Sequence, residues 1–312
     1  MGQGDDYVPF AVRFRAWWDG VEPGAMVRDG QAGSVRRNRL IVVDTPKMEG
    51  GDGDRAELRY RLWSRLYGEG FSLPGGQEVT TQLLKYIDLQ KSHTVLDMAA
   101  GLGGTMRAAA LQFGATVMGL EPDPDVAELG MKLSLIRGIE ARVPISTYDP
   151  DTISLSDQAY DVIVMRERLS RLPGRPKLLA QMEKGLTAGG KVVITDLLLA
   201  AQGWGGSRKV AAAIVEDETV PWTLGEFQEE CGKHGLQIHL FRDETEGYRR
   251  LLLDSWTDFS NNITKESLDR AFVDVLMGEA EVMKRRIAAI NAGALRYGYI
   301  ELRRGGGRPP SA

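Results

Sequence analysis

The sequence predicts an α/β fold: a Rossmann-like, mostly parallel sheet of seven strands with helices on both faces. From about residue 56 onward, short apolar runs alternate with longer segments of helical periodicity. The apolar runs carry few polar residues, as expected for strands that are buried on both faces. Such strands, when they alternate with helices, form parallel sheets through repeated strand–helix–strand units. The last two strands are expected to form an antiparallel hairpin at one edge.

Each expected element is an apolar or amphipathic run bounded by turn-forming residues. The seven strands are expected at residues 93–98, 116–120, 140–146, 160–165, 191–199, 236–243 and 296–304. Helices are expected at residues 80–89, 105–113, 125–138, 177–186, 224–235 and roughly 265–294. The turn Ala188-Gly189-Gly190 is expected to end the fourth of these helices.

Residues 1–55 differ from the rest of the chain and are expected to form an N-terminal extension. It contains an aromatic, basic segment with the pair Trp17–Trp18, a short strand expected at residues 39–44, and a Gly/Asp linker. We expect the aromatic segment to pack on the protein's own main domain; the alternatives are a protein partner or peripheral contact with a membrane surface. Residues 56–304 are expected to form the main domain, and the tail 305–312 is expected to be disordered.

The composition excludes several classes of protein. Of the 312 residues, 43% are hydrophobic and 26% are charged, as in an ordinary globular protein. The formal net charge of −4 offers no basic surplus for binding nucleic acid. One cysteine, Cys231, excludes an intramolecular disulfide, and the three histidines are not at ligand spacing for a metal site. No apolar run is long enough to span a membrane and no secretory signal is present, so we expect a cytoplasmic protein.

Two acidic residues lie at the ends of the first two expected strands. Asp97 ends one apolar run and is followed by the small-residue segment Ala99–Gly104, and Glu121 ends the next run. In open α/β sheets ligands bind beyond the carboxyl ends of the strands, so both acids are expected at one site. A dinucleotide site requires a small residue three positions after its second glycine, where this chain has the bulky Met106. This argues against a pyrophosphate ligand.

S-adenosylmethionine fits these residues better, because it carries no phosphate. An acid at the end of the first strand suits the cationic amino group, and the glycines let the backbone pass close to the nucleoside. Glu121 can accept hydrogen bonds from both ribose hydroxyls. The alternative interpretation is a tight strand-to-helix turn with an incidental acid.

Three segments resemble the class I S-adenosylmethionine-dependent methyltransferases. "VLDMAAGLGG" resembles their first motif, "YDVIVMRE" their fourth strand, and "GLTAGGKVVITDLLL" their L-x-P-G-G-x-L-x-I-x-D segment. Within that fold the chain is similar to the phosphoethanolamine methyltransferases, through "LWSRLYGEGFSLPGGQEVTTQLL", "YDVIVMRERLSRL" and "RRIAAINAGALRYGYIELRR". The resemblance covers about residues 60–304. It implies the class I methyltransferase fold and methyl transfer from S-adenosylmethionine to a small-molecule acceptor.

Carried over by position, the resemblance implies a complete cofactor site. The implied cofactor-binding residues are Asp97, Ala99, Gly101, Gly103, Glu121, Pro122, Asp149 and Arg166. In that arrangement the glycine turn surrounds the methionine part, Glu121 binds the ribose, and the chain around Arg166 closes over the cofactor. Asp149 would accept a hydrogen bond from the exocyclic amine of adenine, which is a donor. Its alternative role is that of a turn residue in "YDPD".

The acceptor side departs from the phosphoethanolamine methyltransferase pattern. Arg171 stands where the pattern has a histidine, and Leu197 where it has a tyrosine. A second tyrosine of the pattern falls near Arg55. An arginine and a lysine that contact phosphate fall on Asp217 and Glu301, which would repel a phosphate dianion if they line the pocket. The phosphobase-specific residues are therefore not retained, and phosphobase activity is not carried over.

One acid, Glu167, remains beside the expected active-site edge and is the candidate general base. The aromatic residues that are candidates for the pocket wall or lid are Tyr67, Phe71, Trp204, Trp222, Tyr248, Trp256 and Tyr297. Such walls suit a cationic amine or a flat phenolic or quinol ring, so N-, O- and C-methylation stay open; the alternative is simple packing. A second class of function is a non-catalytic scaffold or ligand-sensing subunit. The sequence leaves the acceptor and a homodimeric state open.

Overall fold

The computed structural model describes residues 8–22, 55–200, 220–264 and 268–305, so the strand expected at 39–44 and nearly all of the tail lie outside it. At its centre is a seven-stranded sheet of order β3-β2-β1-β4-β5-β7-β6. The strands are β1 Thr94–Asp97, β2 Thr116–Glu121, β3 Ile145–Thr147, β4 Tyr160–Arg166, β5 Leu186–Leu199, β6 Leu236–Asp243 and β7 Leu295–Arg304. β1 to β5 pair in parallel, and β7 runs antiparallel to both of its neighbours. The predicted fold class is confirmed.

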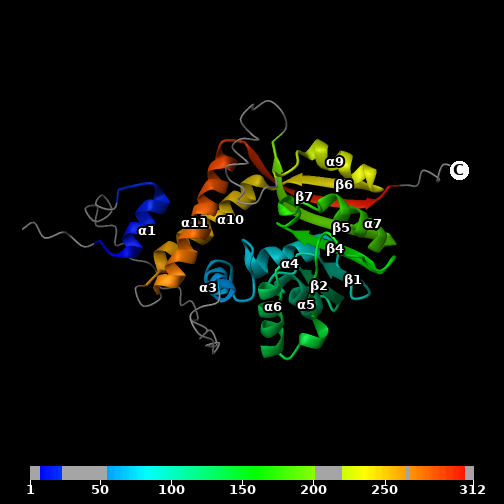
Figure 1. Ribbon diagram of the computed structural model, residues 1–312, viewed down its shortest axis with the longest axis horizontal. Helices are drawn as coiled ribbons and strands as arrows, with labels where there is room; N and C mark the ends of the chain where they lie inside the picture. The colour runs from blue at the N-terminus through cyan, green and yellow to red at the C-terminus, as the bar shows by residue number, and fades with distance from the viewer. Residues whose placement is uncertain (1–7, 23–54, 201–219, 265–267, 306–312) are drawn as a thin grey trace, which may run out of the picture.

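Helices cover both faces of this sheet (Figure 1). They are α1 Phe10–Asp19, α3 Arg55–Tyr67, α4 Gly76–Tyr86, α5 Gly104–Gln112, α6 Pro124–Ile136, α7 Arg175–Gly185, α9 Leu224–Lys233, α10 Thr245–Asn262 and α11 Arg270–Asn291, with short 3-10 helices η1 Glu140–Arg142 and η2 Leu169–Arg171. α4, α5 and α6 share a core with strand residues such as Val95 and Val164. α7 and α9 pack on the opposite face, against Leu96 and Ile163. Burial on both faces explains the continuous apolar runs of the strands.

A further group of helices, α1, α3, α10 and α11, packs together at one end of the sheet (Figure 1). Their shared core includes Leu199 at the end of β5. α1 joins this group through aromatic contacts: Trp18 stacks on Trp256 at a ring distance of 5.0 Å, and Phe14 meets Phe259 edge-on at 6.2 Å. The aromatic N-terminal segment therefore packs on the protein's own helices. In the described ranges, no helix combines the length and apolar character that a bilayer crossing requires.

The strand expected at residues 140–146 is shorter and starts later. Glu140–Arg142 form η1, and β3 covers only Ile145–Thr147. Pro144, directly before β3, has no N–H to donate to a ladder, which limits the strand on that side. Its carbonyl oxygen accepts a hydrogen bond from the Gly119 N–H at 2.9 Å, so pairing with β2 begins at the proline.

The expected antiparallel hairpin at the sheet edge is wrong in its connection. β6 and β7 do pair antiparallel, and β6 is the edge strand. The chain between them forms α10 and α11, which are 18 and 22 residues long, so no tight turn joins the two strands. Only α11 is predicted by the sequence pattern, over roughly 265–294. Its start is fixed at Asp269, whose carboxylate accepts a hydrogen bond from the Phe272 N–H at 2.7 Å.

α7 ends earlier than expected. The helix stops at Gly185, and Ala188-Gly189-Gly190 lie in the first part of β5. Tyr160 of β4 already pairs with Leu186, and the register then shifts before regular pairing resumes. Strand pairing therefore begins immediately after the helix, and the two glycines sit in an irregular strand segment rather than in a helix cap.

Candidate active site

The carboxyl ends of four neighbouring strands bring charged residues to one edge of the sheet. Asp97 ends β1, Glu121 ends β2, Arg166 ends β4, and Asp196 lies near the end of β5. All four are buried, with exposed fractions between 1% for Asp97 and 6% for Arg166. Buried charges cost stability unless they are paired or hydrogen-bonded, so their gathering marks this edge as the candidate active site.

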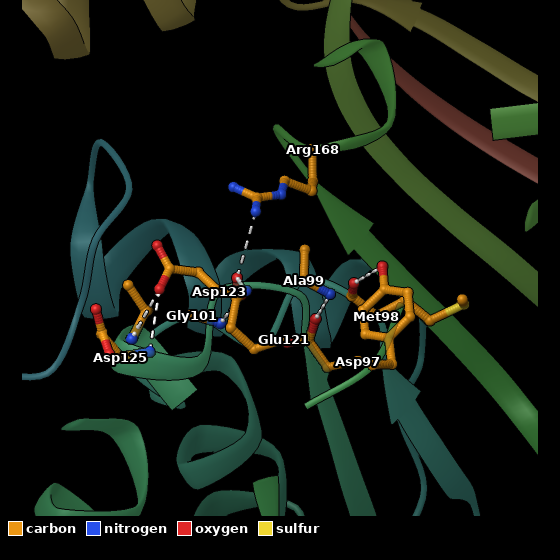
Figure 2. A network of polar contacts seen from close by, with 10 residues as sticks. Asp97, Met98, Ala99, Gly101, Glu121, Asp123, Asp125 and Arg168 are labelled. Carbon is orange, nitrogen blue, oxygen red and sulfur yellow. Dashed lines mark hydrogen bonds and ion pairs between the residues drawn. The ribbon is translucent and has the colours of Figure 1, made fainter. Parts of the chain in front are cut away.

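The backbone of the turn after β1 adopts a conformation that favours glycine at two positions. Gly101 has a φ of 52° and Gly103 a φ of 79°, both in the left-handed region that favours glycine. A Cβ on Gly103 would also lie 2.8 Å from the Arg107 guanidinium and 3.0 Å from the Ile145 side chain. The turn brings the Gly101 N–H to 2.9 Å from Glu121 Oε2, so a hydrogen bond links the ends of β1 and β2 (Figure 2).

Glu121 uses only part of its hydrogen-bonding capacity within the protein. Its Oε1 accepts a hydrogen bond from the Asp123 N–H at 3.1 Å, and the Arg168 guanidinium lies 3.6 Å from the same oxygen (Figure 2). Burial raises the pKa of Glu121, while Arg168 and the backbone hydrogen bonds act in the opposite direction. A carboxylate has about four lone-pair sites, so Glu121 retains capacity for two hydroxyl donors.

Asp97 is a buried acid with an unusual proton affinity. The Ala99 N–H donates to its Oδ1 at 3.0 Å (Figure 2). Burial raises the pKa of Asp97 to about 7; the Ala99 hydrogen bond and Arg166 lower it, and Glu121 raises it further. A cationic partner would favour the ionised carboxylate, so this site is suited to an ammonium group.

Arg166 supplies a complementary donor at the same edge. Its Nη1 donates to Thr80 Oγ1 at 2.9 Å, whereas its Nε is buried and has no hydrogen-bond partner among the described residues. An unpaired buried donor costs about 1–3 kcal/mol, so a ligand acceptor here would be favourable. An amino acid offers a carboxylate to Arg166 and an ammonium group to Asp97. The residues present therefore fit the methionine part of S-adenosylmethionine.

Asp149 and Pro122 are the least engaged of the predicted cofactor residues. Pro122 is half-buried directly after Glu121. Asp149 is exposed, and its two carboxylate oxygens accept hydrogen bonds from the Asp151 N–H at 2.9 Å and the Thr152 hydroxyl at 3.1 Å. Asp149 thus stabilises the turn in which it lies, and its contact with adenine stays a prediction.

Two residues at this edge are not among the sequence predictions. Tyr148 donates its hydroxyl to the Met98 carbonyl oxygen at 3.0 Å, and burial, together with Glu121, raises its pKa. Arg168 contacts Glu121, as described above. Both side chains come from loops that follow strands. The only signal for them in the sequence is that position, because neither belongs to a motif with fixed spacing.

Glu167, the residue after Arg166, anchors a second, buried group of polar residues. The Tyr248 hydroxyl donates to Glu167 Oε2 at 2.9 Å, Arg286 Nη1 lies 3.2 Å from the same oxygen, and the Tyr297 hydroxyl donates to Oε1 at 3.4 Å. We call Glu167, Tyr248, Arg286 and Tyr297 the acceptor-side cluster. Glu167 has a φ of 50°, an uncommon backbone for a residue other than glycine. Such strain is found preferentially at functional sites.

The acceptor-side cluster combines neutral phenols with a cation. The rings of Tyr248 and Tyr297 are parallel and 3.8 Å apart, and Arg286 Nη1 donates to the Tyr248 oxygen at 2.6 Å. Burial raises the pKa of Tyr248 well above its usual value, although Arg286 lowers it in part. Burial alone would lower the pKa of Arg286, but Tyr248 and Glu167 outweigh burial and raise it. At neutral pH the tyrosines are therefore uncharged donors and Arg286 is a cation.

Asp196 fixes the loop that follows β4. Its carboxylate accepts hydrogen bonds from the Ser170 N–H at 2.9 Å, the Ser170 hydroxyl at 2.7 Å and the Leu197 N–H at 2.7 Å. Burial raises the pKa of Asp196, and these hydrogen bonds oppose that shift. The interaction holds η2 against the end of β5, and with it Arg171, the last residue of η2.

The predicted acceptor-side aromatics divide into two groups. Those in or beside the acceptor-side cluster are Tyr67, Tyr248, Trp256 and Tyr297. Trp222 instead packs against Arg175, whose guanidinium lies 4.0 Å from its ring centre. Phe71 lies next to Gly104, where an added Cβ would come within 2.5 Å of its ring. Trp204 lies outside the described residues.

Glu301 does not face the acceptor-side cluster. It pairs with Arg303 at 2.8 Å and lies opposite Val193 of β5. Tyr297 is four residues away on the same strand, a distance of about 13 Å. Glu301 therefore gives no argument against an anionic acceptor, contrary to the expectation from sequence; Asp217 lies outside the described residues.

The single thiol is not a candidate for chemistry. Cys231 is buried, and burial raises its pKa to about 12, so it stays protonated at neutral pH. Among the residues that the structure describes, no three His, Cys, Asp or Glu side chains are grouped so as to hold a metal ion. The charged residues at the carboxyl edge are thus the candidate functional groups.

Comparison with known proteins agrees with this geometry. The family described as a methyltransferase domain matches residues 76–245. Phosphoethanolamine N-methyltransferases 3 and 1 of Arabidopsis thaliana are 31% identical over 139 residues and 26% identical over 228 residues, covering 45% and 73% of this chain. A solved structure of phosphoethanolamine N-methyltransferase 2 from Haemonchus contortus superposes with a TM-score of 0.67 at 19% identity, covering 81% of this chain and 61% of that one. Geranyl diphosphate C-methyltransferase from Streptomyces coelicolor superposes with a TM-score of 0.59 at 18% identity, covering 72% and 75%.

The alignments with the curated relatives cover only part of each relative's length. The chain spans only 27% and 40% of the length of the two Arabidopsis proteins. The solved structures are less than 20% identical to this chain, so their similarity shows the fold alone. The family match, in contrast, includes the glycine turn, both buried acids and Glu167, and it extends over more than half of the chain. This chain belongs to the methyltransferase domain family.

Proposed function

We propose that this protein is an S-adenosylmethionine-dependent methyltransferase that acts on a small molecule. The observation that carries the proposal is the pair of buried acids, Asp97 and Glu121, which end neighbouring strands at the carboxyl edge of the sheet and accept hydrogen bonds from Ala99 and Gly101 of the same turn. Membership of the family supports methyl transfer. Solved structures of the same fold contain S-adenosylhomocysteine or S-adenosylmethionine, which supports the choice of cofactor.

The proposed cofactor site uses each charged group for a different part of the ligand. Asp97 binds the ammonium group, and Arg166 binds the carboxylate through its unpaired Nε. Glu121 accepts hydrogen bonds from the ribose hydroxyls. The remaining residues, which line the backbone turn and the adenine side, are Ala99, Gly101, Gly103, Pro122 and Asp149. When bound, the cofactor supplies a methyl group on a sulfonium, which carries the intrinsic reactivity.

The chain itself has three tasks on the acceptor side: to align the acceptor, to exclude water and to remove a proton where the acceptor carries one. The apolar core of α1, α3, α10 and α11 keeps bulk water from this end of the sheet. Glu167 is the proposed proton acceptor. Tyr248 and Arg286 fix the orientation of its carboxylate by hydrogen bonds at 2.9 and 3.2 Å.

The identity of the acceptor is not taken from the relatives. Arg171 and Leu197 replace the histidine and tyrosine of the phosphoethanolamine methyltransferase pattern, and both lie at the carboxyl edge. We therefore propose a small-molecule acceptor that is methylated on nitrogen, oxygen or carbon, and we do not assign a phosphobase.

A non-catalytic scaffold or ligand-sensing subunit is the alternative that the sequence leaves open. Nothing in the structure favours it. Asp97 and Arg166 are buried at a cost in folding free energy, and a scaffold gains nothing from that cost. An enzyme recovers the cost when the ligand binds.

The proposal also includes the bounds of the catalytic domain, the location of the protein and the role of the N-terminal segment. Residues 56–304 form the catalytic domain, and the protein is cytoplasmic. The burial of Trp18 against Trp256 supports an internal role for the aromatic N-terminal segment over contact with a membrane or a partner. Vesicle sedimentation tests the membrane alternative, and light scattering tests the homodimer.

Calorimetric titration with S-adenosylhomocysteine tests the cofactor site. Micromolar binding to the wild type is expected, and Glu121→Ala should weaken it about 100-fold, because two charge-assisted hydrogen bonds are lost. Glu128→Ala is the matched control, since Glu128 is an exposed acid of α6 that pairs with Lys132. Absence of binding to the correctly folded wild type would overturn the enzyme proposal and favour the scaffold.

A further inference from the structure

Arg171 is a charged residue near the acceptor-side cluster whose side chain bonds none of the residues that the structure describes. Within the part of the chain that the structure describes, its guanidinium makes no hydrogen bond and no ion pair. Burial nevertheless lowers its pKa, and the nearby Arg286 contributes to the same shift. The side chain is surrounded by protein atoms and yet stays partly accessible. Part of the side chain is therefore in contact with solvent.

The acids closest to Arg171 are already engaged. Glu167 accepts hydrogen bonds from Tyr248, Tyr297 and Arg286. Asp196 accepts three hydrogen bonds from Ser170 and Leu197, outside the acceptor-side cluster. Glu167 and Asp196 attract the Arg171 guanidinium and Arg286 repels it, but the hydrogen bonds of both acids go to other residues, so neither acid is a direct partner of Arg171.

A guanidinium that is largely surrounded by protein and has no hydrogen-bonded partner loses part of its hydration without compensation, and an anionic ligand would supply that compensation. Its planar fork matches carboxylate and phosphate oxygens in a bidentate manner. We propose that Arg171 binds an oxyanionic group, a carboxylate or a phosphate, on the methyl acceptor. This rests on the proposed function and narrows it, because it restricts the acceptor to molecules with an anionic group.

The position of Arg171 places the proposed anion site away from the proposed cofactor site. Arg166, five residues earlier at the end of β4, lies beside Asp97 and is assigned to the methionine carboxylate. Arg171 lies on η2, near Glu167 and Tyr248 of the acceptor-side cluster. An acceptor anchored by its anion at Arg171 would therefore present its remaining atoms to Glu167. The anion sets the distance between the anchored end and the reacting atom, so Arg171 determines specificity and positions the acceptor.

Anion titration of the full-length protein tests the proposal. Inorganic phosphate and benzoate are titrated by calorimetry at constant ionic strength, with and without saturating S-adenosylhomocysteine, into the wild type, Arg171→Gln, Arg171→Lys and Arg249→Gln. Arg249, paired with Glu246 on the surface of α10, is the matched control. We expect at least one probe to bind the wild type and to bind Arg171→Gln roughly tenfold more weakly or worse. Arg171→Lys should retain intermediate affinity, and Arg249→Gln full affinity.

Two further readouts separate the possible explanations. Arg171→Gln should keep the wild-type affinity for S-adenosylhomocysteine, and its melting temperature without anion should be unchanged or higher, because it removes an unpaired charge. Phosphate binding alone, or benzoate binding alone, identifies which oxyanion the acceptor carries.

Several outcomes would overturn the assignment: no binding of either probe to the wild type, equal binding to Arg171→Gln, or an equal loss of S-adenosylhomocysteine affinity in that variant. The last result would transfer Arg171 to the cofactor site. Failure of S-adenosylhomocysteine to bind the wild type would overturn the proposed function alone, because the titration without it still reports on Arg171.

Discussion

At the scale of single residues, the site is built from charges that the fold withdraws from water. Asp97 and Glu121 are buried, each accepts hydrogen bonds from backbone N–H groups, and burial raises the pKa of both. These acids lower the stability of the ligand-free protein when they are ionised. In the proposed site, a ligand with an ammonium group and two hydroxyls would supply partners for both acids.

Asp97 should make the stability of the ligand-free protein depend on pH. Its pKa is about 7 in the folded state against 3.8 as the usual value, so the folded protein binds more protons than the unfolded chain between these values. Stability from this group is therefore lost as pH rises from about 4 to about 7. Urea unfolding at intervals from about pH 5 to about pH 8 should show the wild type losing stability relative to Asp97→Asn as the pH rises.

The control for this measurement is Asp254→Asn, which changes an exposed acid on α10. Its difference from the wild type should stay constant over the same pH range. A constant difference for Asp97→Asn as well would show that Asp97 is ionised in both states and that its burial has no effect on its proton affinity.

Glu167 should be required for turnover but not for cofactor binding. Glu167→Gln preserves the volume of the side chain and removes the proton-accepting charge, so kcat should fall by about 100- to 10,000-fold for an acceptor that loses a proton. S-adenosylhomocysteine affinity should stay within about twofold of the wild type, because among the described residues the Glu167 carboxylate bonds Tyr248, Arg286 and Tyr297 of the acceptor-side cluster. Unchanged turnover in the variant, with Glu229→Gln as the surface control, would remove Glu167 as the base.

The sequence predicts those site residues that a single strand end positions. Asp97, Glu121 and Arg166 each close an apolar run, and the carboxyl ends of parallel strands meet at one edge. Tyr248 and Arg286 could not be placed in this way, because they lie 81 and 119 residues from Glu167 and reach it only through tertiary packing.

At the scale of elements, α1 is held by α10 rather than by the sheet. Trp18 stacks on Trp256, Phe14 meets Phe259, and the Lys284 ammonium group of α11 lies 4.1 Å from the ring centre of Trp17. These contacts make α1 a part of the helical group that α3, α10 and α11 form. Asp97, Glu121 and Arg166, which lie at the strand ends, make none of these contacts.

Trp18→Ala should therefore destabilise the protein without weakening cofactor binding. Loss of a buried tryptophan side chain costs about 3–5 kcal/mol in unfolding free energy, and Trp18 is buried in the shared core of the helices. Urea unfolding measures this loss, and calorimetry with S-adenosylhomocysteine should give the wild-type affinity. Val21→Ala, at an exposed position beyond α1, should change stability by less than about 0.5 kcal/mol. Equal stability of Trp18→Ala and the wild type would show that α1 is not anchored by this contact.

Elements with a strong local pattern could be predicted, and those that depend on tertiary context could not. β1, β2 and β4 are continuous apolar runs, and α6 follows Asp123, whose carboxylate accepts hydrogen bonds from its first turn. α10 was missed because its surface is mixed and its buried side chains, such as Trp256 and Tyr248, contact other helices and β7 instead of a neighbouring strand–helix unit.

At the scale of the whole molecule, the elements form two groups that position different parts of the candidate site. β1 to β5 with α4 to α9 form a series of local strand–helix units, which is why the sequence predicts them. α1, α3, α10 and α11 come from both ends of the described chain and meet only in the folded protein. The first group presents Asp97, Glu121 and Arg166, and the second encloses the acceptor-side cluster.

The connection between β6 and β7 consists of α10 and α11, and both of its ends lie at the same edge of the sheet. α10 and α11 leave the sheet after β6 and return at β7, and these two strands are hydrogen-bonded neighbours. Both ends of the helical pair are thus anchored at nearly the same place, so its length and sequence can change while the sheet keeps its register. The insertion carries Tyr248 and Arg286 of the acceptor-side cluster, whereas Asp97, Glu121, Arg166 and Arg171 lie outside it, so a change in the insertion would alter the surroundings of Glu167 and leave those four residues in place.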